Sequence, residues 1–173
     1  MTAEEVKKNQ IRRVEANDPV AIRQMGVYNH IIEGDYESAF ENYTKAFELG
    51  DLEAHYHLGV LHSNGEGVNR DPIKEMYHFE QAAIGGHPAA RHDLGNEELK
   101  NGKTERAVKH FIIAANLGYD TSLETLRKCY PMGMIRKEDY AAALRAHQAA
   151  VDATKSPQRE AAGITGLDLR TTL

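Results

Sequence analysis

The sequence predicts an all-α protein, a right-handed α-solenoid of stacked helical hairpins. A signature of a small residue, three variable residues, an apolar residue and usually Gly occurs four times among the 173 residues. The four copies begin at Ala21, Ala54, Ala90 and Ser122, at intervals of 33, 36 and 32 residues. Self-similarity at this period is typical of repeats of two helices, in which each repeat buries its apolar face against its neighbours.

A second apolar pattern follows each signature and predicts the second helix of each hairpin. Its apolar residues recur at spacings of three and four, which places them on one helical face. In three copies the pattern ends at glycine, the residue that most easily adopts the left-handed conformation at a helix end. The helices are predicted at residues 18–32, 36–49, 52–63, 72–84, 88–100, 104–117, 121–131 and 137–153.

The starts of the helices and their contacts are also marked in the sequence. Asp18-Pro19 and Asp71-Pro72 place a capping carboxylate before Pro at the first helical position. The glycine of each signature leaves room for a neighbouring helix to approach closely. Large residues of the second helices, such as Phe79, are expected to fill the space between hairpins.

The repeats divide the chain into three parts. Residues 1–17 are expected to form an N-terminal capping helix, the second helix of a truncated repeat, which suggests a segment of a longer chain. Residues 18–154 hold the four repeats, at 18–50, 51–86, 87–118 and 119–154. Ser156-Pro157 is expected to end the last helix, and residues 155–173 to form a partly disordered extension.

Composition excludes several classes of function. The net charge of −5 and the absence of Trp argue against a nucleic-acid binder, which needs basic residues and often stacking rings. A mean hydropathy of −0.58, without a long apolar run, argues against a membrane protein. The single cysteine, Cys129, suits a reducing, intracellular compartment, and we expect a cytoplasmic protein with a buried, inert thiol.

The second repeat carries the fullest pattern, from Ala54 through Leu58-Gly59 and Gly65-Glu66-Gly67-Val68 to Gly86. It resembles the Sel-like repeat, a relative of the tetratricopeptide repeat with a Gly-x-Gly-Val loop between its helices. The tracts from Ala82 to His92 and from Ala141 to Ala161 resemble a branch expanded in unicellular algae, whose members often carry a zinc module ahead of the repeats. The resemblance implies adaptor or scaffold work in protein complexes, without a shared active site.

Two motifs invite other interpretations. Gly65-Glu66-Gly67 begins like a dinucleotide-binding loop, but the third Gly and the preceding strand are missing, which favours an interhelical turn. Nine histidines, among them His55, His57 and His92, leave a histidine-based metal site as an alternative. The spacing of three or four that a helical metal site uses is absent within the helices, so we expect no metal or other cofactor.

The predicted function is that of a non-enzymatic scaffold that binds a protein or peptide on the concave face of the solenoid. In tetratricopeptide-like stacks the first helices line that face, so the second, sixth and ninth positions after each repeat start form one stripe. Tyr and Arg are frequent binding hot spots. A structural protein that assembles into weak end-to-end dimers is the other alternative. The predicted binding residues are Arg23, Val27, His30, Tyr56, Val60, His92, Asn96, Glu124 and Lys128.

Overall fold

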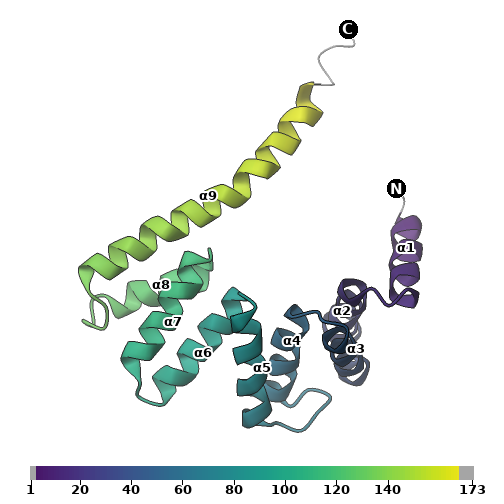
Figure 1. The fold of residues 1–173 in the computed structure, drawn as a ribbon, viewed down its shortest axis with the longest axis horizontal. Helices are drawn as coiled ribbons and strands as arrows, with labels where there is room; N and C mark the ends of the chain where they lie inside the picture. The colour runs from purple at the N-terminus through teal and green to yellow at the C-terminus, as the bar shows by residue number, and fades with distance from the viewer. Residues whose placement is uncertain (1–2, 168–173) are drawn as a thin grey trace. The chain divides into compact units, whose positions relative to one another are not determined.

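The predicted all-α fold is confirmed. A computed structural model describes residues 3–167, with side chains described for residue 5 and residues 8–154, and these residues contain helices and no strand (Figure 1). The helices are α1 (Ala3–Glu15), α2 (Pro19–Tyr28), the π-helix η1 (Asn29–Glu33), α3 (Tyr36–Glu48), α4 (Glu53–Asn64), α5 (Pro72–Ile84), α6 (Pro88–Lys100), α7 (Thr104–Asn116), α8 (Asp120–Cys129) and α9 (Lys137–Leu167).

Seven of the eight predicted repeat helices are found with both ends within two residues of the prediction. The first continues from α2 into the π-helix η1, which ends at Gly34 with a left-handed φ of 67°. The helix expected before the first repeat is α1. Its role as a cap derived from a truncated repeat stays a prediction.

The predicted break at Ser156-Pro157 is wrong. Helix α9 runs through both residues to Leu167. Proline removes one backbone hydrogen bond and crowds the preceding turn, but strong helix formers on both sides can outweigh this penalty. Alanine is frequent on each side of Pro157, at Ala149, Ala150, Ala161 and Ala162. The extension expected to be partly disordered over residues 155–173 is helical as far as Leu167, and residues 168–173 lie outside the described residues.

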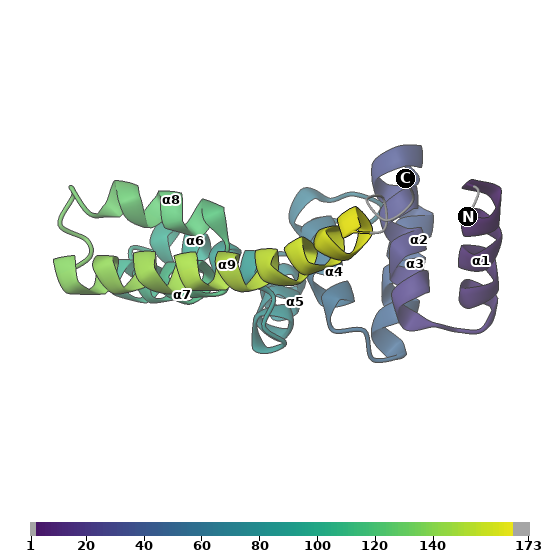
Figure 2. The same ribbon diagram turned by 90° about the horizontal axis from the view of Figure 1, so that it is seen from above.

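The chain forms two compact units, residues 1–94 and 95–173, with the boundary inside α6. In the first unit α2 lies beside α3, and α4 lies beside α5 (Figure 2). In the second unit α7 packs against both α8 and α9. The first two helix pairs lie in the first unit and the fourth in the second, whereas the boundary divides the third pair, α6 and α7.

In the first three repeats the side chain three residues before the repeat start accepts a backbone N–H at the beginning of the first helix. Tyr119, at the equivalent place before α8, makes no such bond. The Asp18 carboxylate accepts the backbone N–H groups of Val20 and Ala21 at 3.0 and 3.2 Å. The Asp51 carboxylate accepts that of Glu53 at 2.9 Å. These bonds satisfy donors that a helix N-terminus leaves without partners, which fixes where each first helix begins.

A glycine of the first helix faces an aromatic ring of the second helix in each of the first three pairs. A Cβ atom added to Gly59 would lie 2.6 Å from the ring of Phe79, and one added to Gly26 would lie 2.7 Å from the ring of Tyr43. The sequence led us to expect these rings between hairpins. They pack within each hairpin, because only glycine lets the two helices approach so closely.

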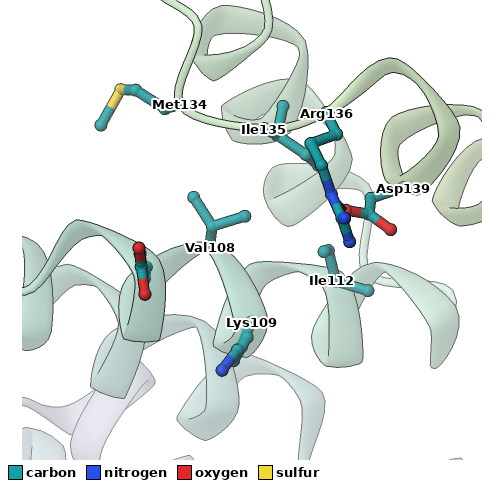
Figure 3. A pocket seen from close by; sticks show the side chains of 8 residues that line it. Val108, Lys109, Ile112, Met134, Ile135, Arg136 and Asp139 are labelled. Atoms are coloured by element: carbon teal, nitrogen blue, oxygen red, sulfur yellow. Dashed lines mark hydrogen bonds and ion pairs between the residues drawn. The ribbon is translucent and has the colours of Figure 1, made fainter.

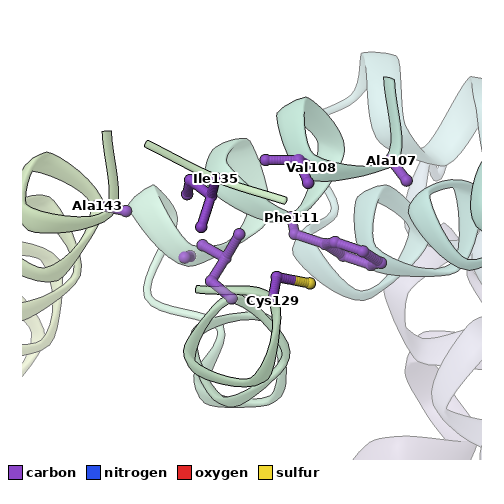
Figure 4. Packing of buried hydrophobic residues seen from close by; sticks show 8 residues of the cluster. Ala107, Val108, Phe111, Cys129, Ile135 and Ala143 are labelled. Carbon is purple, nitrogen blue, oxygen red and sulfur yellow. The ribbon is translucent and has the colours of Figure 1, made fainter. Parts of the chain in front are cut away.

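The core of the second unit is a cluster of buried residues that includes Phe111 (Figure 4). It contains Val108 and Phe111 from α7, Cys129 from α8, Ile135 from the segment before α9 and Ala143 from α9. Cys129 is 5% exposed, and burial raises the pKa of its thiol. The predicted buried cysteine is confirmed, and its thiol stays protonated and weakly nucleophilic near neutral pH.

The Gly-x-Gly-Val segment is an interhelical turn between α4 and α5. Gly65 ends α4 with a φ of 75°, and Gly67 has a φ of 69°. A Cβ atom on Gly67 would lie 2.5 Å from the carbonyl oxygen of Tyr36. Gly67 is thus required both for its left-handed backbone and for its close approach to α3, which attaches the second repeat to the first.

Candidate functional site

The predicted binding residues of the first unit differ in solvent exposure. Arg23, His30 and Tyr56 are partly exposed. Val27 and Val60 are partly buried against hydrophobic clusters, so their side chains also belong to the core. His92 is only 7% exposed, which leaves little of its ring for a partner.

Arg23 joins the first two repeats through an ion-pair network. Its Nε lies 2.8 Å from the Asp51 carboxylate, and its Nη1 lies 3.1 Å from the Glu53 carboxylate. The Asp51 side chain is 5% exposed, whereas that of Glu53 is 56% exposed. The guanidinium compensates a buried carboxylate, so Arg23 supports the fold as well as the surface.

Six rings, alternately Tyr and His, form a continuous row through the first unit. We call it the ring row. Its closest steps are the stacked pairs Tyr43–His57 and Tyr56–His87, with ring centroids 4.6 and 4.2 Å apart. The members in order are Tyr36, His30, Tyr43, His57, Tyr56 and His87.

Two histidines of the ring row, His57 and His87, are held in the neutral form. Burial, together with the nearby charges of Arg23, His87 and His30, lowers the pKa of His57 to about 4. Burial also lowers the pKa of His87. The Nδ1 atom of His87 accepts the backbone N–H of Ala90 at 3.2 Å, so its proton lies on Nε2, 4.0 Å from the Glu53 carboxylate.

The loop of the second repeat reaches the other end of the ring row. The Glu66 carboxylate lies 3.0 Å from Nε2 of His30 and accepts a hydrogen bond from the Asn64 side-chain amide at 3.2 Å. His30 also packs edge-on against Tyr36, with ring centroids 5.6 Å apart. Contacts between repeats therefore position both ends of the row.

A second group of histidines lies between α4 and α5. Nδ1 of His55 and Nδ1 of His78 are 2.9 Å apart, and the His62 ring stacks on that of His78 at 5.7 Å. Burial is the main cause that lowers the pKa of His78 to about 4. Among residues whose side chains are described, no three His, Cys, Asp or Glu side chains converge closely enough to hold a metal ion.

The predicted binding residues of the second unit are less constrained. Asn96 is partly buried on α6, while Glu124 and Lys128 are exposed on α8. Glu124 lies 3.7 Å from the guanidinium of Arg127, with both side chains more than 60% exposed. An ion pair this exposed contributes little rigidity, and no ring row involves these residues.

The second unit contains a cavity of about 350 Å³ between α7 and the start of α9 (Figure 3). Its apolar lining includes Val108, Ile112 and Met134. Arg136 and Asp139 pair at its edge at 2.8 Å. Glu105 and Lys109 of α7 complete the polar part of its lining.

Sequence reasoning missed most of the residues that hold the ring row in place. His57 and His87 were outside the predicted stripe, as were Asp51, Glu53 and Glu66. A usable signal was the capping position three residues before each repeat start, where Asp51 and His87 both occur. The contacts across repeats depend on helix orientation and carry no signature in residue spacing.

Comparison with known proteins identifies the repeats. A sequence model of the Sel1 repeat matches residues 19–51, 52–87 and 88–119, more than half of the chain. The chain belongs to the Sel1 repeat family. Sel1 repeat proteins generally mediate protein–protein interactions and generally act as non-enzymatic scaffolds.

Two solved structures show the same fold of stacked Sel1 repeats. A Sel1 repeat protein from Oxalobacter formigenes is similar with 27% identity and a TM-score of 0.72, over 88% of this chain and 65% of that one. A protective antigen of uropathogenic Escherichia coli strains that displays an SLR fold has 26% identity and a TM-score of 0.66, over 84% of this chain and 32% of that one. The chain thus spans less than two thirds of either protein. No helix among the described residues is long and apolar enough to cross a membrane.

Proposed function

We propose that this chain is a non-enzymatic adaptor that binds a segment of a partner protein on the concave face of its solenoid, where the first helices of the repeats lie. The observation that carries the proposal is the ring row with Arg23 beside it. Arg23, His30 and Tyr56 are partly exposed. Their contacts with Asp51, Tyr43 and His87, respectively, hold them in place. Side chains fixed before binding lose little entropy when a partner arrives.

The residues of this face are of the kinds that dominate binding energy elsewhere. Tyr and Arg are enriched among hot spots, above all where neighbours exclude water. Arg23, His30 and Tyr56 supply the polar part of the proposed face, and Val27 and Val60 supply an apolar part. His92, which is 7% exposed, offers little surface to a partner. In the second unit, the proposed contact residues occupy the same positions after the repeat starts. They are Asn96, Glu124 and Lys128.

The experiment that tests the proposal is selection of a random-sequence peptide library, displayed on phage, against the wild-type chain. Selected peptides are then measured on Tyr56→Ala and on the matched control Tyr130→Ala. Tyr130 is also a stacked, partly exposed tyrosine, paired with Tyr140 in the second unit. We expect Tyr56→Ala to weaken binding about tenfold or more, as truncation of a hot-spot tyrosine does, and Tyr130→Ala to leave it unchanged.

Arg23 is unsuitable as the first substitution, because its removal leaves the buried Asp51 carboxylate without its partner and destabilises the fold. Failure to select any peptide above background, or equal binding to wild type and Tyr56→Ala, contradicts the proposal. Light scattering over a concentration series of the same samples tests the end-to-end dimers that the sequence left as an alternative.

A further inference from the structure

The surface around Glu53 carries more negative than positive charge. We define the Glu53 patch as Arg23, Asp51, Glu53, Tyr56 and His87. Asp51 and Glu53 share the single guanidinium of Arg23, at 2.8 and 3.1 Å. Burial lowers the pKa of His87, so its ring stays neutral near neutral pH. One negative charge therefore remains without compensation in the patch.

That charge is accessible at Glu53. Its side chain is 56% exposed, whereas the Asp51 side chain is 5% exposed and already accepts a backbone N–H as well as the Arg23 guanidinium. A carboxylate can accept about four hydrogen bonds. Glu53 has Arg23 on one oxygen, while the other faces His87 at 4.0 Å, too far for a strong bond. Glu53 can therefore accept further donors from outside the molecule.

An aromatic surface lies beside this carboxylate. The Tyr56 and His87 rings stack with centroids 4.2 Å apart and an interplanar angle of 18°. Nε2 of His87 lies 4.0 Å from the Glu53 carboxylate, and Tyr56 adjoins this carboxylate through its stack with His87. A flat ring next to an acidic group is the arrangement that holds a cationic side chain, because the ring face attracts the cation and the alkyl stem.

The charge of the whole first unit has the same sign as the patch. Residues 1–94 contain nine Lys and Arg against sixteen Asp and Glu, a formal charge of −7, whereas residues 95–173 carry +2. A field of one sign attracts a partner of the opposite sign and raises the rate at which it arrives.

We infer that the partner segment presents a Lys or Arg side chain to the Glu53 patch, with the cation at the Glu53 carboxylate and the stem against Tyr56 and His87. The inference rests on the proposed function, because it names the chemistry of the segment bound at that face. Segments with an acidic residue in this place are rejected, because their charge meets the uncompensated carboxylate.

The test uses the peptides selected on the wild-type chain. Their sequences are expected to be enriched in Lys or Arg relative to the starting library. One fluorescein-labelled peptide is then compared, by fluorescence polarisation, with the same peptide carrying norleucine in place of lysine, or citrulline in place of arginine. We expect each replacement to weaken binding about tenfold, the effect of losing one charge-assisted hydrogen bond.

Glu53→Gln is the matching change on the protein side. It keeps the size of the side chain and removes its charge, and we expect the same loss of about tenfold. Glu80→Gln is the control, because Glu80 is exposed on α5 in the same unit and its replacement changes the unit charge equally. The control is expected to retain wild-type affinity. Circular dichroism of both variants checks that they are folded.

Each outcome decides a different claim. Peptides that depend on Tyr56 but lack Lys and Arg, and bind Glu53→Gln as tightly as wild type, leave the proposed function in place and overturn the cationic partner. Equal losses in Glu53→Gln and Glu80→Gln show attraction by the whole unit and also overturn it. Peptides that ignore both Tyr56 and Glu53 contradict the proposed function itself.

Discussion

In the first three helix pairs a glycine of the first helix lies against an aromatic ring of the second, whereas the fourth pair has neither. Gly26, Gly59 and Gly95 face Tyr43, Phe79 and Phe111, respectively. In the fourth pair the equivalent positions, by the spacing of the third pair, are Arg127 and Ala143. Ala143 is 1% exposed, and the Arg127 side chain is 72% exposed.

The comparison shows that the two positions change together. In the first three pairs, a glycine on one helix and a large ring on the other together fill the space between the helices. In the fourth pair, an exposed side chain on one helix and a buried alanine on the other give a second form of close packing. The Sel1 sequence model matches the first three repeats and stops at residue 119. Helices α8 and α9 still contact each other as a fourth pair.

Removing the aromatic ring from one of the glycine–ring pairs should cause the largest loss of stability. We expect Phe111→Ala to lower the free energy of unfolding by about 3–5 kcal/mol, because Phe111 is fully buried and leaves a cavity against Gly95. Urea denaturation measures the loss. The double variant Gly95→Leu with Phe111→Ala should recover part of it by filling the space from the other helix. No recovery in the double variant would mean that the two positions are not coupled.

Replacing the glycine of such a pair by a large residue should cause the next largest loss of stability. Gly59→Leu forces a side chain into the Phe79 ring, 2.6 Å from the new Cβ, and we expect a net loss of about 1–3 kcal/mol, even after the gain in helix propensity. Arg127→Leu at the equivalent position of the fourth pair should stay within about 0.5 kcal/mol of wild type. The same denaturation series compares them, and similar losses for both would remove the distinction between the two kinds of pair.

Acidification should destabilise the first unit more than the second, because seven of the nine histidines lie in the first. The folded state holds the pKa of His57 and of His78 at about 4, below the ordinary 6.5. Their contribution to stability is therefore complete above pH 6.5 and is lost as the pH falls toward 4, because the unfolded chain binds protons first.

Hydrogen exchange measured by mass spectrometry across this pH range follows each unit separately. Residues 1–94 should lose protection at a higher pH than residues 95–173. His57→Phe keeps a flat ring against Tyr43 and should reduce the pH dependence of the first unit. Equal loss of protection in both units would contradict the assignment to the buried histidines.

The smallest effect is expected at a helix cap. Asp71 accepts the backbone N–H groups of Ile73 and Lys74 at the start of α5, both at 3.1 Å. Asp71→Ala should lower the free energy of unfolding by about 1 kcal/mol. Lys103, the residue before α7, makes no side-chain cap, so Lys103→Ala is the comparison and should change the stability less, as measured by thermal unfolding.

The helices were predictable because their signals are local. The apolar spacing, Asp before Pro and Gly after each run determine where a helix starts and ends, so seven of the eight predicted helices agree closely with the structure. The predicted end of α9 is wrong because a proline usually ends a helix, whereas the helix-forming alanines on both sides of Pro157 let this one continue.

The site was predictable only in part. Arg23 and Tyr56 were found from their helix position, whereas the role of Arg23 as the partner of the buried Asp51 was not. The ring row joins His30, Tyr43 and His57 across two repeats, and such contacts depend on how one helix pair is rotated on the next. That rotation cannot be predicted from the spacing of residues within one repeat.

The short distance between His55 and His78 has a consequence for the protons of the second repeat. Two Nδ1 atoms 2.9 Å apart can share only one hydrogen. One imidazole must therefore carry its proton on Nδ1 while the other carries it on Nε2, so the two rings are opposite tautomers. The repeat can exist as two isomers with the same heavy-atom positions, and conversion from one to the other requires a proton to move on both rings.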